Sequence, residues 1–232
     1  MKKETSQKLL KLSQKEYDQY ASEFSTSRKF FWSELEFIKK YVKKNDKVLD
    51  IGCGNGRLSD ILIDKNIQYT GIDFSKELIN IAKKERKNNG NFIQANALSL
   101  PFKDNSFDVI FSIAVLHHIP SKENRLLFIS EVNRVLKPEG IFIVTTWNTL
   151  NWKFAKKHLI YFLKKIFGYS KLDFGDIILT FGKNKRKRYI HSLTKKELKK
   201  IITKNNFVDI SIKKIKRKSG HSNFISISKK TH

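Results

Sequence analysis

The sequence predicts an α/β fold with a mostly parallel sheet, helices on both faces and a C-terminal antiparallel hairpin. Two observations predict it. Between residues 47 and 146, short apolar segments alternate with amphipathic ones, which is typical of βαβ units. Two further apolar segments, 207–215 and 223–228, flank a turn at Ser219-Gly220 and indicate a hairpin at the sheet edge.

Seven segments have the length and apolar content of strands. The first, 47–51, is a short buried strand that leads into a glycine loop, and the rest alternate with helical periodicity up to a turn at 137–140. The predicted strands are 47–51, 68–72, 91–94, 107–113, 141–146, 207–215 and 223–228.

The helices are predicted from apolar residues at helical spacing. In the segment 30–44 these are Phe31, Leu35, Ile38 and Val42. The predicted helices are part of the first 28 residues and the segments 30–44, 57–65, 76–87, 124–136, 152–167 and 194–204.

Length and composition fit one soluble domain. The chain has 232 residues, of which 40% are hydrophobic, enough for a sizeable core. The 47 basic residues exceed the 22 acidic ones by 25, and this charge favours an anionic partner, nucleic acid before a membrane surface. Only eight of the 47 are arginine, and the lysine and asparagine excess is also what an AT-rich genome produces.

Cysteine content and hydropathy exclude other classes. The single cysteine, Cys53, excludes an internal disulfide scaffold and a cysteine-based zinc cluster, so we expect no metal site. The charged start lacks the apolar run of a signal peptide, and the most apolar stretch, 107–119, is too short to span a bilayer. We expect a cytoplasmic protein with no membrane association.

The segment Val48-Leu49-Asp50-Ile51-Gly52-Cys53-Gly54-Asn55-Gly56 is the most informative. Glycines between a strand and a helix let the backbone approach a ligand closely. A dinucleotide fingerprint would place its third glycine at position 57, which is arginine here. The pattern instead suits a nucleoside with a short charged tail, such as S-adenosylmethionine, although a tight turn without a ligand is an alternative.

Three more signals follow later strands. Asp73 ends the second strand, where a carboxylate can accept both ribose hydroxyls of an adenosine. Its alternative role, capping the next helix, fits less well because Ser75 is better placed as N-cap. The segments 95–98 and 112–118 end the next two strands, so all four signals meet at the edge where open α/β sheets bind ligands.

Over residues 17–148 these motifs resemble the class I S-adenosylmethionine-dependent methyltransferases. The resemblance implies a Rossmann-like, seven-stranded fold divided into an N-terminal helical cap (1–46), an S-adenosylmethionine-binding core (47–148), and a helical insertion with the closing helix and strands of the same domain (149–232). It implies Asp50, Gly52, Gly54 and Gly56 at the methionine end, Asp73 at the ribose, Asn96 at the adenine amino group, and Cys53, Phe74, Ala97 and Ser112 as further cofactor-binding residues. Asn96 replaces the usual aspartate, and its side-chain oxygen can still accept a hydrogen bond.

A narrower resemblance is to the tRNA wobble-uridine carboxymethyl methyltransferases, which make the methyl ester of 5-carboxymethyluridine in the anticodon. It implies a tRNA anticodon-loop substrate and, from eukaryotic members, a small zinc-binding activator protein. The matching segments are 96–102, 112–118, Ser27-Arg28-Lys29 with Trp32, 174–177, Arg188-Tyr189-Ile190-His191 before Glu197-Leu198, and 220–223.

The chemistry of that reaction assigns roles. A carboxylate is ionised at neutral pH and needs no general base, so orientation dominates. A clamp for it is expected from Arg28, Arg188, Tyr189 and His191. His117 or His118 is expected to face the substrate, with His117 as the catalytic candidate, unless each is only hydrogen-bonded within a loop.

For several sequence features, two interpretations remain open. Trp32 and Trp147 stack on an anticodon base or pack in the core. Cys53 is expected to be a small packing residue rather than a nucleophile. The basic runs 183–188 and 213–218 follow tRNA phosphates or form a solvated face, and the helix at 152–167 covers the substrate cleft or lies on an anionic membrane.

Three functions remain open in this order. The first is a tRNA wobble-uridine methyltransferase. The second is a methyltransferase of a small metabolite, since the cofactor-binding fold serves many substrates. The third is a non-catalytic RNA-binding subunit, against which the intact glycine loop and Asp73 argue.

Overall fold

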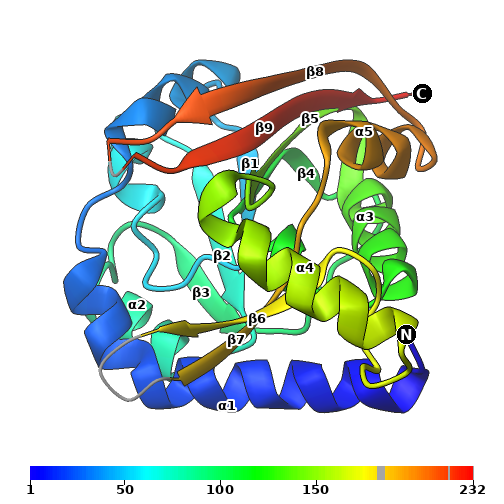
Figure 1. Ribbon diagram of the computed structural model, residues 1–232. Coiled ribbons are helices and arrows are strands. Elements are labelled where there is room, and N and C mark those ends of the chain that lie inside the picture. The colour runs from blue at the N-terminus through cyan, green and yellow to red at the C-terminus, as the bar shows by residue number, and fades with distance from the viewer. Residues whose placement is uncertain (182–185, 219, 232) are drawn as a thin grey trace.

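A computed structural model describes residues 1–181, 186–218 and 220–231. Seven strands form one sheet in the order β3-β2-β1-β4-β5-β9-β8 (Figure 1). The first five are parallel, whereas β9 runs antiparallel to β5 and β8 antiparallel to β9. The strands are β1 Lys47–Ile51, β2 Gln68–Asp73, β3 Asn91–Gln94, β4 Phe107–Ile113, β5 Leu136–Trp147, β8 Phe207–Lys216 and β9 Ser222–Lys230. The predicted fold class, including the closing hairpin, is confirmed.

Helices cover both faces of the sheet and also cross its carboxyl edge. The helix α1 runs along the bottom of Figure 1, beneath α2 and a second, two-stranded sheet of β6 and β7. The remaining elements are α1 Lys3–Ser27, α2 Lys76–Glu85, α3 Lys122–Val135, α4 Trp152–Ile166, β6 Asp176–Phe181, β7 Arg186–His191 and α5 Lys195–Thr203. In the part of the chain that the structure describes, no helix combines the length and the apolar character needed to cross a membrane.

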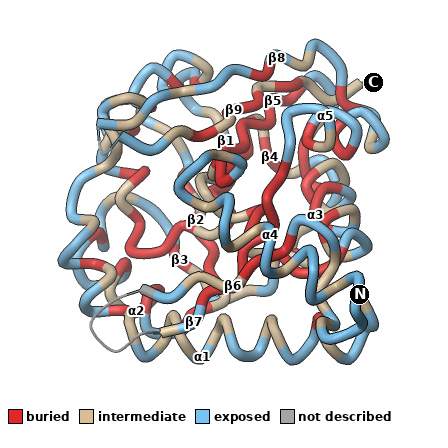
Figure 2. Tube along the Cα trace, viewed as in Figure 1, coloured by how far each residue is buried: buried red, intermediate tan, exposed pale blue. Residues whose placement is uncertain are grey.

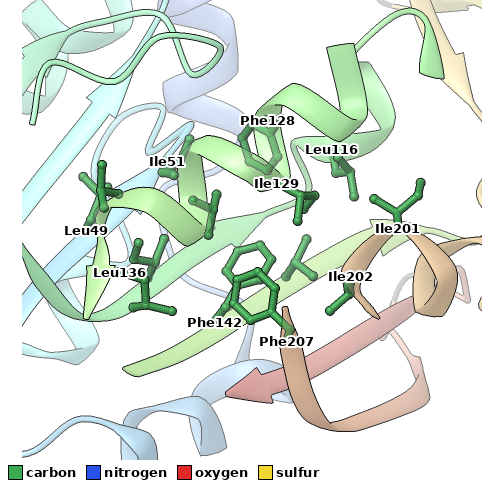
Figure 3. Packing of buried hydrophobic residues seen from close by; sticks show 14 of the residues in the cluster. Leu49, Ile51, Leu116, Phe128, Ile129, Leu136, Phe142, Ile201, Ile202 and Phe207 are labelled. Atoms are coloured by element: carbon green, nitrogen blue, oxygen red, sulfur yellow. The ribbon is translucent and has the colours of Figure 1, made fainter. Parts of the chain in front are cut away.

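Side chains of alternate residues in the central strands pack into two separate hydrophobic cores, one on each face of the sheet. Leu49 and Ile110 point to the face covered by α3 and α5, and their neighbours Val48 and Val109 point to the face covered by α2. Figure 3 shows the first core, where side chains of β1, α3 and α5 converge on Phe142. Burial is concentrated in β1, β4 and β5, whereas α1 and α4 are largely exposed (Figure 2). Strands buried on both faces hold the carboxyl edge of the sheet rigid.

Two predicted α-helices are 3₁₀ structure instead. The segment 30–44 holds a 3₁₀ helix at Ser33–Tyr41, in which the buried Leu35 and Ile38 stand three residues apart, one turn of that helix. The segment 57–65 forms two short turns, Ser59–Ile61 and Ile63–Lys65. The cause lies partly in Ser59, whose N–H and hydroxyl both donate to the Gly56 carbonyl at a separation of three residues.

Other differences concern strands. The hairpin of β6 and β7 was not predicted, because the first half of its second strand, 186–188, belongs to the basic run 183–188. Residues 183–185 of this run lie outside the described residues. The predicted turn at 137–140 lies within β5, where Phe107 pairs with Leu136 and Val109 with Ile141, so the residues between form a bulge. Of the predicted turn at Ser219-Gly220, Ser219 lies outside the described residues, and Gly220 has a φ of +78°.

Truncating a leucine in the core should destabilise the protein far more than truncating one on α4. Leu49 is fully buried, whereas Leu159 is 58% exposed. We expect Leu49→Ala to lower the free energy of unfolding by about 2–5 kcal/mol, because it leaves a cavity. Chemical denaturation checks this, with Leu159→Ala as the matched control. Equal losses in the two variants would contradict the assignment of the core.

Candidate active site

A cavity opens at the carboxyl ends of the central strands, beside β1 and β4. These two strands are neighbours at the point where the strand order reverses, which is where open α/β sheets bind ligands. Its lining comes from α1, the glycine loop and the ends of β2, β3 and β4, together with Trp147 at the end of β5 and Arg188 in β7. The lining includes Tyr17, Phe24, Arg28, Trp32, Asp50, Gly52, Cys53, Gly54, Arg57, Asp73, Phe74, Ala95, Asn96, Ala97, Leu98, Ile113, Ala114, Val115, His118, Trp147 and Arg188.

The glycine loop needs glycine on steric grounds. Gly52 has a φ of +75°, and a Cβ there would overlap the side chain of Val115. The N–H groups of Gly52 and Cys53 both donate to the Ile72 carbonyl, at 2.8 and 2.9 Å. Gly56, also at positive φ, lies behind the cavity rather than in its lining, where a Cβ would meet Phe92.

Asp73 fastens the loop to the end of β2. Its two carboxylate oxygens accept hydrogen bonds from the N–H groups of Gly54 and Ser75, both at 2.9 Å. Ser75 is the N-cap of α2, as predicted, and accepts from the Leu78 N–H. Burial raises the pKa of Asp73 to about 6, although these backbone hydrogen bonds favour the ionised form. Asp73 also lines the cavity.

Asp50 presents a buried oxygen that lacks a partner. The Tyr69 hydroxyl donates to Oδ2 at 2.7 Å, while Oδ1 is buried and accepts no hydrogen bond from the described residues. Burial raises the pKa of Asp50 to about 7. A cationic group placed here would supply the missing partner and favour the carboxylate. The cavity therefore fits a ligand with a positively charged end beside the glycine loop, as S-adenosylmethionine has.

The residues that follow β3 line the cavity at some distance along the sheet edge from the glycine loop. These residues are Ala95, Asn96, Ala97 and Leu98, and the Leu98 N–H donates to Asn96 Oδ1 at 2.9 Å, which fixes the side chain. Ser112, expected in this set, is fully buried within β4 and is not in the lining, because the strand turns the next residues toward the cavity instead.

Comparison with known proteins identifies the family. Residues 42–207 match the model of a methyltransferase domain. The chain belongs to this methyltransferase family. A structure of an S-adenosylmethionine-dependent methyltransferase from Methanosarcina mazei superposes with a TM-score of 0.72 at 27% identity, over 87% of this chain and 99% of that one.

Curated relatives match over part of their length. A tRNA (carboxymethyluridine(34)-5-O)-methyltransferase of Xenopus tropicalis is 33% identical over 133 residues, 57% of this chain and 20% of that protein. An uncharacterized protein of Methanocaldococcus jannaschii is 42% identical over 128 residues, 55% of this chain and 47% of that protein. The chain thus spans about half of one relative and a fifth of the other.

A further structure shares the fold. The methyltransferase in a complex with the Trm112 methyltransferase activator of Haloferax volcanii gives a TM-score of 0.70 at 16% identity, over 94% of this chain and 97% of that one. Together these findings make the protein an enzyme, a methyltransferase whose cofactor is S-adenosylmethionine.

The side chains of the adjacent histidines His117 and His118 lie in different surroundings, and only His118 lines the cavity. His118 lines the cavity, and its Nδ1 lies 3.1 Å from the Tyr189 carbonyl, which can only accept, so Nδ1 carries the proton. Burial and the charge of Arg188 lower the pKa of His118 to about 3, which keeps the ring neutral. His117, expected as the catalytic member, is fully buried against Trp147 and does not line the cavity. His118 replaces it as the histidine facing the cavity.

Two of the four expected clamp residues line the cavity. Arg28 and Arg188 do, and the Arg188 guanidinium lies 5.3 Å from the Tyr17 ring and 5.6 Å from the Trp147 ring. Tyr189 and His191 do not, because their side chains are engaged behind β7.

The contacts of Tyr189 and His191 are structural. The Tyr189 hydroxyl donates to Asp176 Oδ1 at 2.7 Å, and His191 contacts Asp176 at 2.6 Å and Glu197 at 2.9 Å. These two carboxylates raise the pKa of His191 against the effect of its burial. This buried group joins the small hairpin to α5, so a direct clamp role for Tyr189 and His191 is not supported.

Sequence reasoning missed Tyr17 and Arg57. Tyr17 stands on α1 with no local motif, and only its tertiary contacts with Phe74 and His118 bring it to the cavity. Arg57 could have been found, because it directly follows the glycine loop. Cys53 lines the cavity, and burial raises the pKa of its thiol well above the usual value, so it stays a thiol. Across residues 1–181, 186–218 and 220–231, no metal-binding cluster is present.

Removing the Asp73 carboxylate should abolish tight cofactor binding. Asp73→Ala leaves the N–H groups of Gly54 and Ser75 without their acceptor and loosens the loop. We expect affinity for S-adenosylmethionine to fall by about a hundredfold or more, measured by calorimetry. The control is Asp64→Ala, an exposed carboxylate outside the cavity. Unchanged affinity for S-adenosylmethionine in Asp73→Ala would contradict the assignment of Asp73 to the cofactor site.

Cofactor affinity should rise with pH. A cationic ligand group favours ionised Asp50, so binding lowers the pKa of this carboxyl from about 7 and releases a proton. Affinity is therefore weaker below that pKa, increases through it and levels off above it. Calorimetry in two buffers of different ionisation enthalpy measures the proton release, and Asp50→Asn should remove it. Proton uptake on binding would contradict this account.

Proposed function

We propose that this methyltransferase forms the methyl ester of 5-carboxymethyluridine at the wobble position of tRNA. The observation that carries the proposal is the pairing of a buried cation, Arg188, with a neutral histidine, His118, in the cavity wall. A fixed guanidinium suits a carboxylate substrate. A histidine with a pKa of about 3 is a poor general base, and this reaction needs none.

In this proposed reaction the main task of the protein is to orient the substrate carboxylate toward the methyl group. S-adenosylmethionine supplies the electrophilic methyl group. The substrate carboxylate has an ordinary pKa near 4 and is ionised at neutral pH. Arg188 would hold it from the side of Tyr17 and Trp147, and the aromatic walls would exclude water, so that the rate depends on alignment.

The cofactor roles follow from the same cavity. In this proposal Asp50 and the glycine loop hold the methionine end, Asp73 the ribose, and Asn96 with Ala97 the adenine. Arg28 lies over Phe24, whose ring is the nearest neighbour of a Cβ built on Gly54, so it is placed closer to the methionine end than to the substrate.

The relatives support the substrate class. The Xenopus protein is named for the carboxymethyluridine reaction, and it is 33% identical over 57% of this chain. A tRNA substrate in turn makes a cytoplasmic location part of the proposal. An activator of the small zinc-binding kind belongs to it as well, since a structural neighbour is a methyltransferase bound to Trm112.

Methyl transfer to RNA tests the proposal. Labelled S-adenosylmethionine is incubated with bulk tRNA from cells lacking the gene, with and without RNase. RNase-sensitive label that mild alkali releases is expected, because esters hydrolyse. Alkali-stable label would move the reaction to a base or ribose. No label in the presence of the activator would favour the small-metabolite reaction, and no cofactor binding at all would favour a non-catalytic subunit.

Removing the Arg188 cation should separate catalysis from cofactor binding. Arg188→Ala is expected to leave cofactor affinity within about twofold and to lower the single-turnover rate on tRNA by about a hundredfold, the usual loss when one fixed charge partner is removed. Arg188→Lys keeps the charge without the planar fork and should lose less. Loss of cofactor affinity in Arg188→Ala would place this residue at the methionine end instead.

A further inference from the structure

Two arginines lie over the indole ring of Trp32, and a third, Arg28, interacts with both of them. The Arg57 guanidinium lies 4.5 Å and the Arg217 guanidinium 3.9 Å from the ring centroid. Arg28 is close enough for its charge to lower the pKa of both. We call Arg28, Trp32, Arg57 and Arg217 the Trp32 cluster.

The arginines of the Trp32 cluster differ from others in the chain. Arg86, Arg125, Arg134 and Arg186 each lie within 4 Å of a carboxylate. Within the described ranges, no carboxylate comes that close to an arginine of the Trp32 cluster. The charges of these three are therefore not neutralised by direct contact with the protein.

Two acids act on this cluster from beyond 4 Å: Asp50 attracts Arg57, and Glu34 attracts Arg217. Glu34 attracts Arg217, but its Oε1 accepts a hydrogen bond from the Lys218 N–H at 2.5 Å. The Arg217 Nε is buried and donates no hydrogen bond to the described residues. A buried donor without an acceptor is costly, so this geometry calls for an anionic oxygen.

Electrostatics point the same way. Burial and the neighbouring charge of Arg28 lower the pKa of Arg57 to about 9. Like charges brought together out of water repel, and a bound anion reverses that cost. Guanidinium groups are planar forks that match phosphate oxygens with two parallel hydrogen bonds.

The Trp32 cluster extends from the cavity to the surface. Arg28, Trp32 and Arg57 line the cavity, whereas Arg217 does not and lies just after β8, in the connection to β9. A single cofactor carboxylate beside the glycine loop would leave Arg217 unused. A polyanion whose target group enters the cavity can use all three.

We propose that the Trp32 cluster binds a backbone phosphate of the RNA substrate, next to the nucleotide that enters the cavity. The inference rests on the proposed function in needing an RNA substrate, and it does not require the ester product. The proposal also assigns a role to Trp32, whose ring packs against guanidinium groups rather than against a stacked base.

The test is RNA binding by Arg217→Ala. The probe is a synthetic anticodon stem–loop with unmodified uridine at the wobble position, which carries phosphates but no carboxyl group. Binding to the full chain with saturating S-adenosylhomocysteine is measured over a range of salt. We expect about tenfold weaker binding, and a slope of log affinity against log salt that is shallower by about one phosphate contact.

Two controls keep the result specific. Lys199→Ala removes an exposed charge on α5 and should change affinity less than about twofold. Arg217→Lys keeps the charge and should retain most of the salt slope, and thermal unfolding verifies that each variant folds. If Arg217→Ala loses no more affinity than Lys199→Ala, the proposal is wrong.

Measuring cofactor binding distinguishes an RNA-binding role of the Trp32 cluster from a cofactor-binding role. If Arg217→Ala weakens S-adenosylmethionine binding and leaves RNA binding intact, the Trp32 cluster serves the cofactor and the proposal is overturned. Alkali-stable methylation of tRNA would overturn the proposed function alone, because the phosphate site is measured on RNA that cannot form the ester. Absence of RNA binding in the unaltered protein would overturn both.

Discussion

The hydrogen bonds that Asp73 accepts from Gly54 and Ser75 hold the active site together. They join the glycine loop after β1 to the start of α2, beside the point where the strand order reverses between β1 and β4. Together with the hydrogen bonds from the Gly52 and Cys53 N–H groups to the Ile72 carbonyl, they fix a loop that depends on left-handed glycine conformations. Asp73 thus ties the glycine loop to the wall of the cavity that Asp50 and Arg57 also line.

Charge is divided along the cavity. Asp50 and Asp73 are buried at the end that suits the cationic cofactor, and burial raises both pKa values. Arg188 lines the cavity beside Tyr17 and Trp147, where we propose that the substrate carboxylate binds. This division fits a reaction in which a cationic methyl donor meets an anionic acceptor, and their attraction is strengthened where water is excluded. The net charge of +25 carries the same preference to the surface.

Sequence predicted what is encoded locally. The sheet strands, the glycine loop, Asp73 and the Ser75 cap all follow from periodicity or from residues adjacent in the chain. Tyr17 and the β6–β7 hairpin were missed because only tertiary contacts define them. Among the histidines, spacing could not decide which ring faces the cavity, since a 3₁₀ turn at Leu116–His118 determines it. Tyr189 and His191 matched a motif, but Asp176 holds both away from the cavity.

Methylation of paired stem–loops tests the central claim most directly. Two synthetic anticodon stem–loops would carry 5-carboxymethyluridine or its amide, 5-carbamoylmethyluridine, at the wobble position and be otherwise identical. After incubation with S-adenosylmethionine, the protein and the proposed activator, mass spectrometry of the nucleosides would show one added methyl group on the carboxylate only. Methylation of both, or of a different nucleoside, would contradict a cavity built to orient an ionised carboxylate beside Arg188.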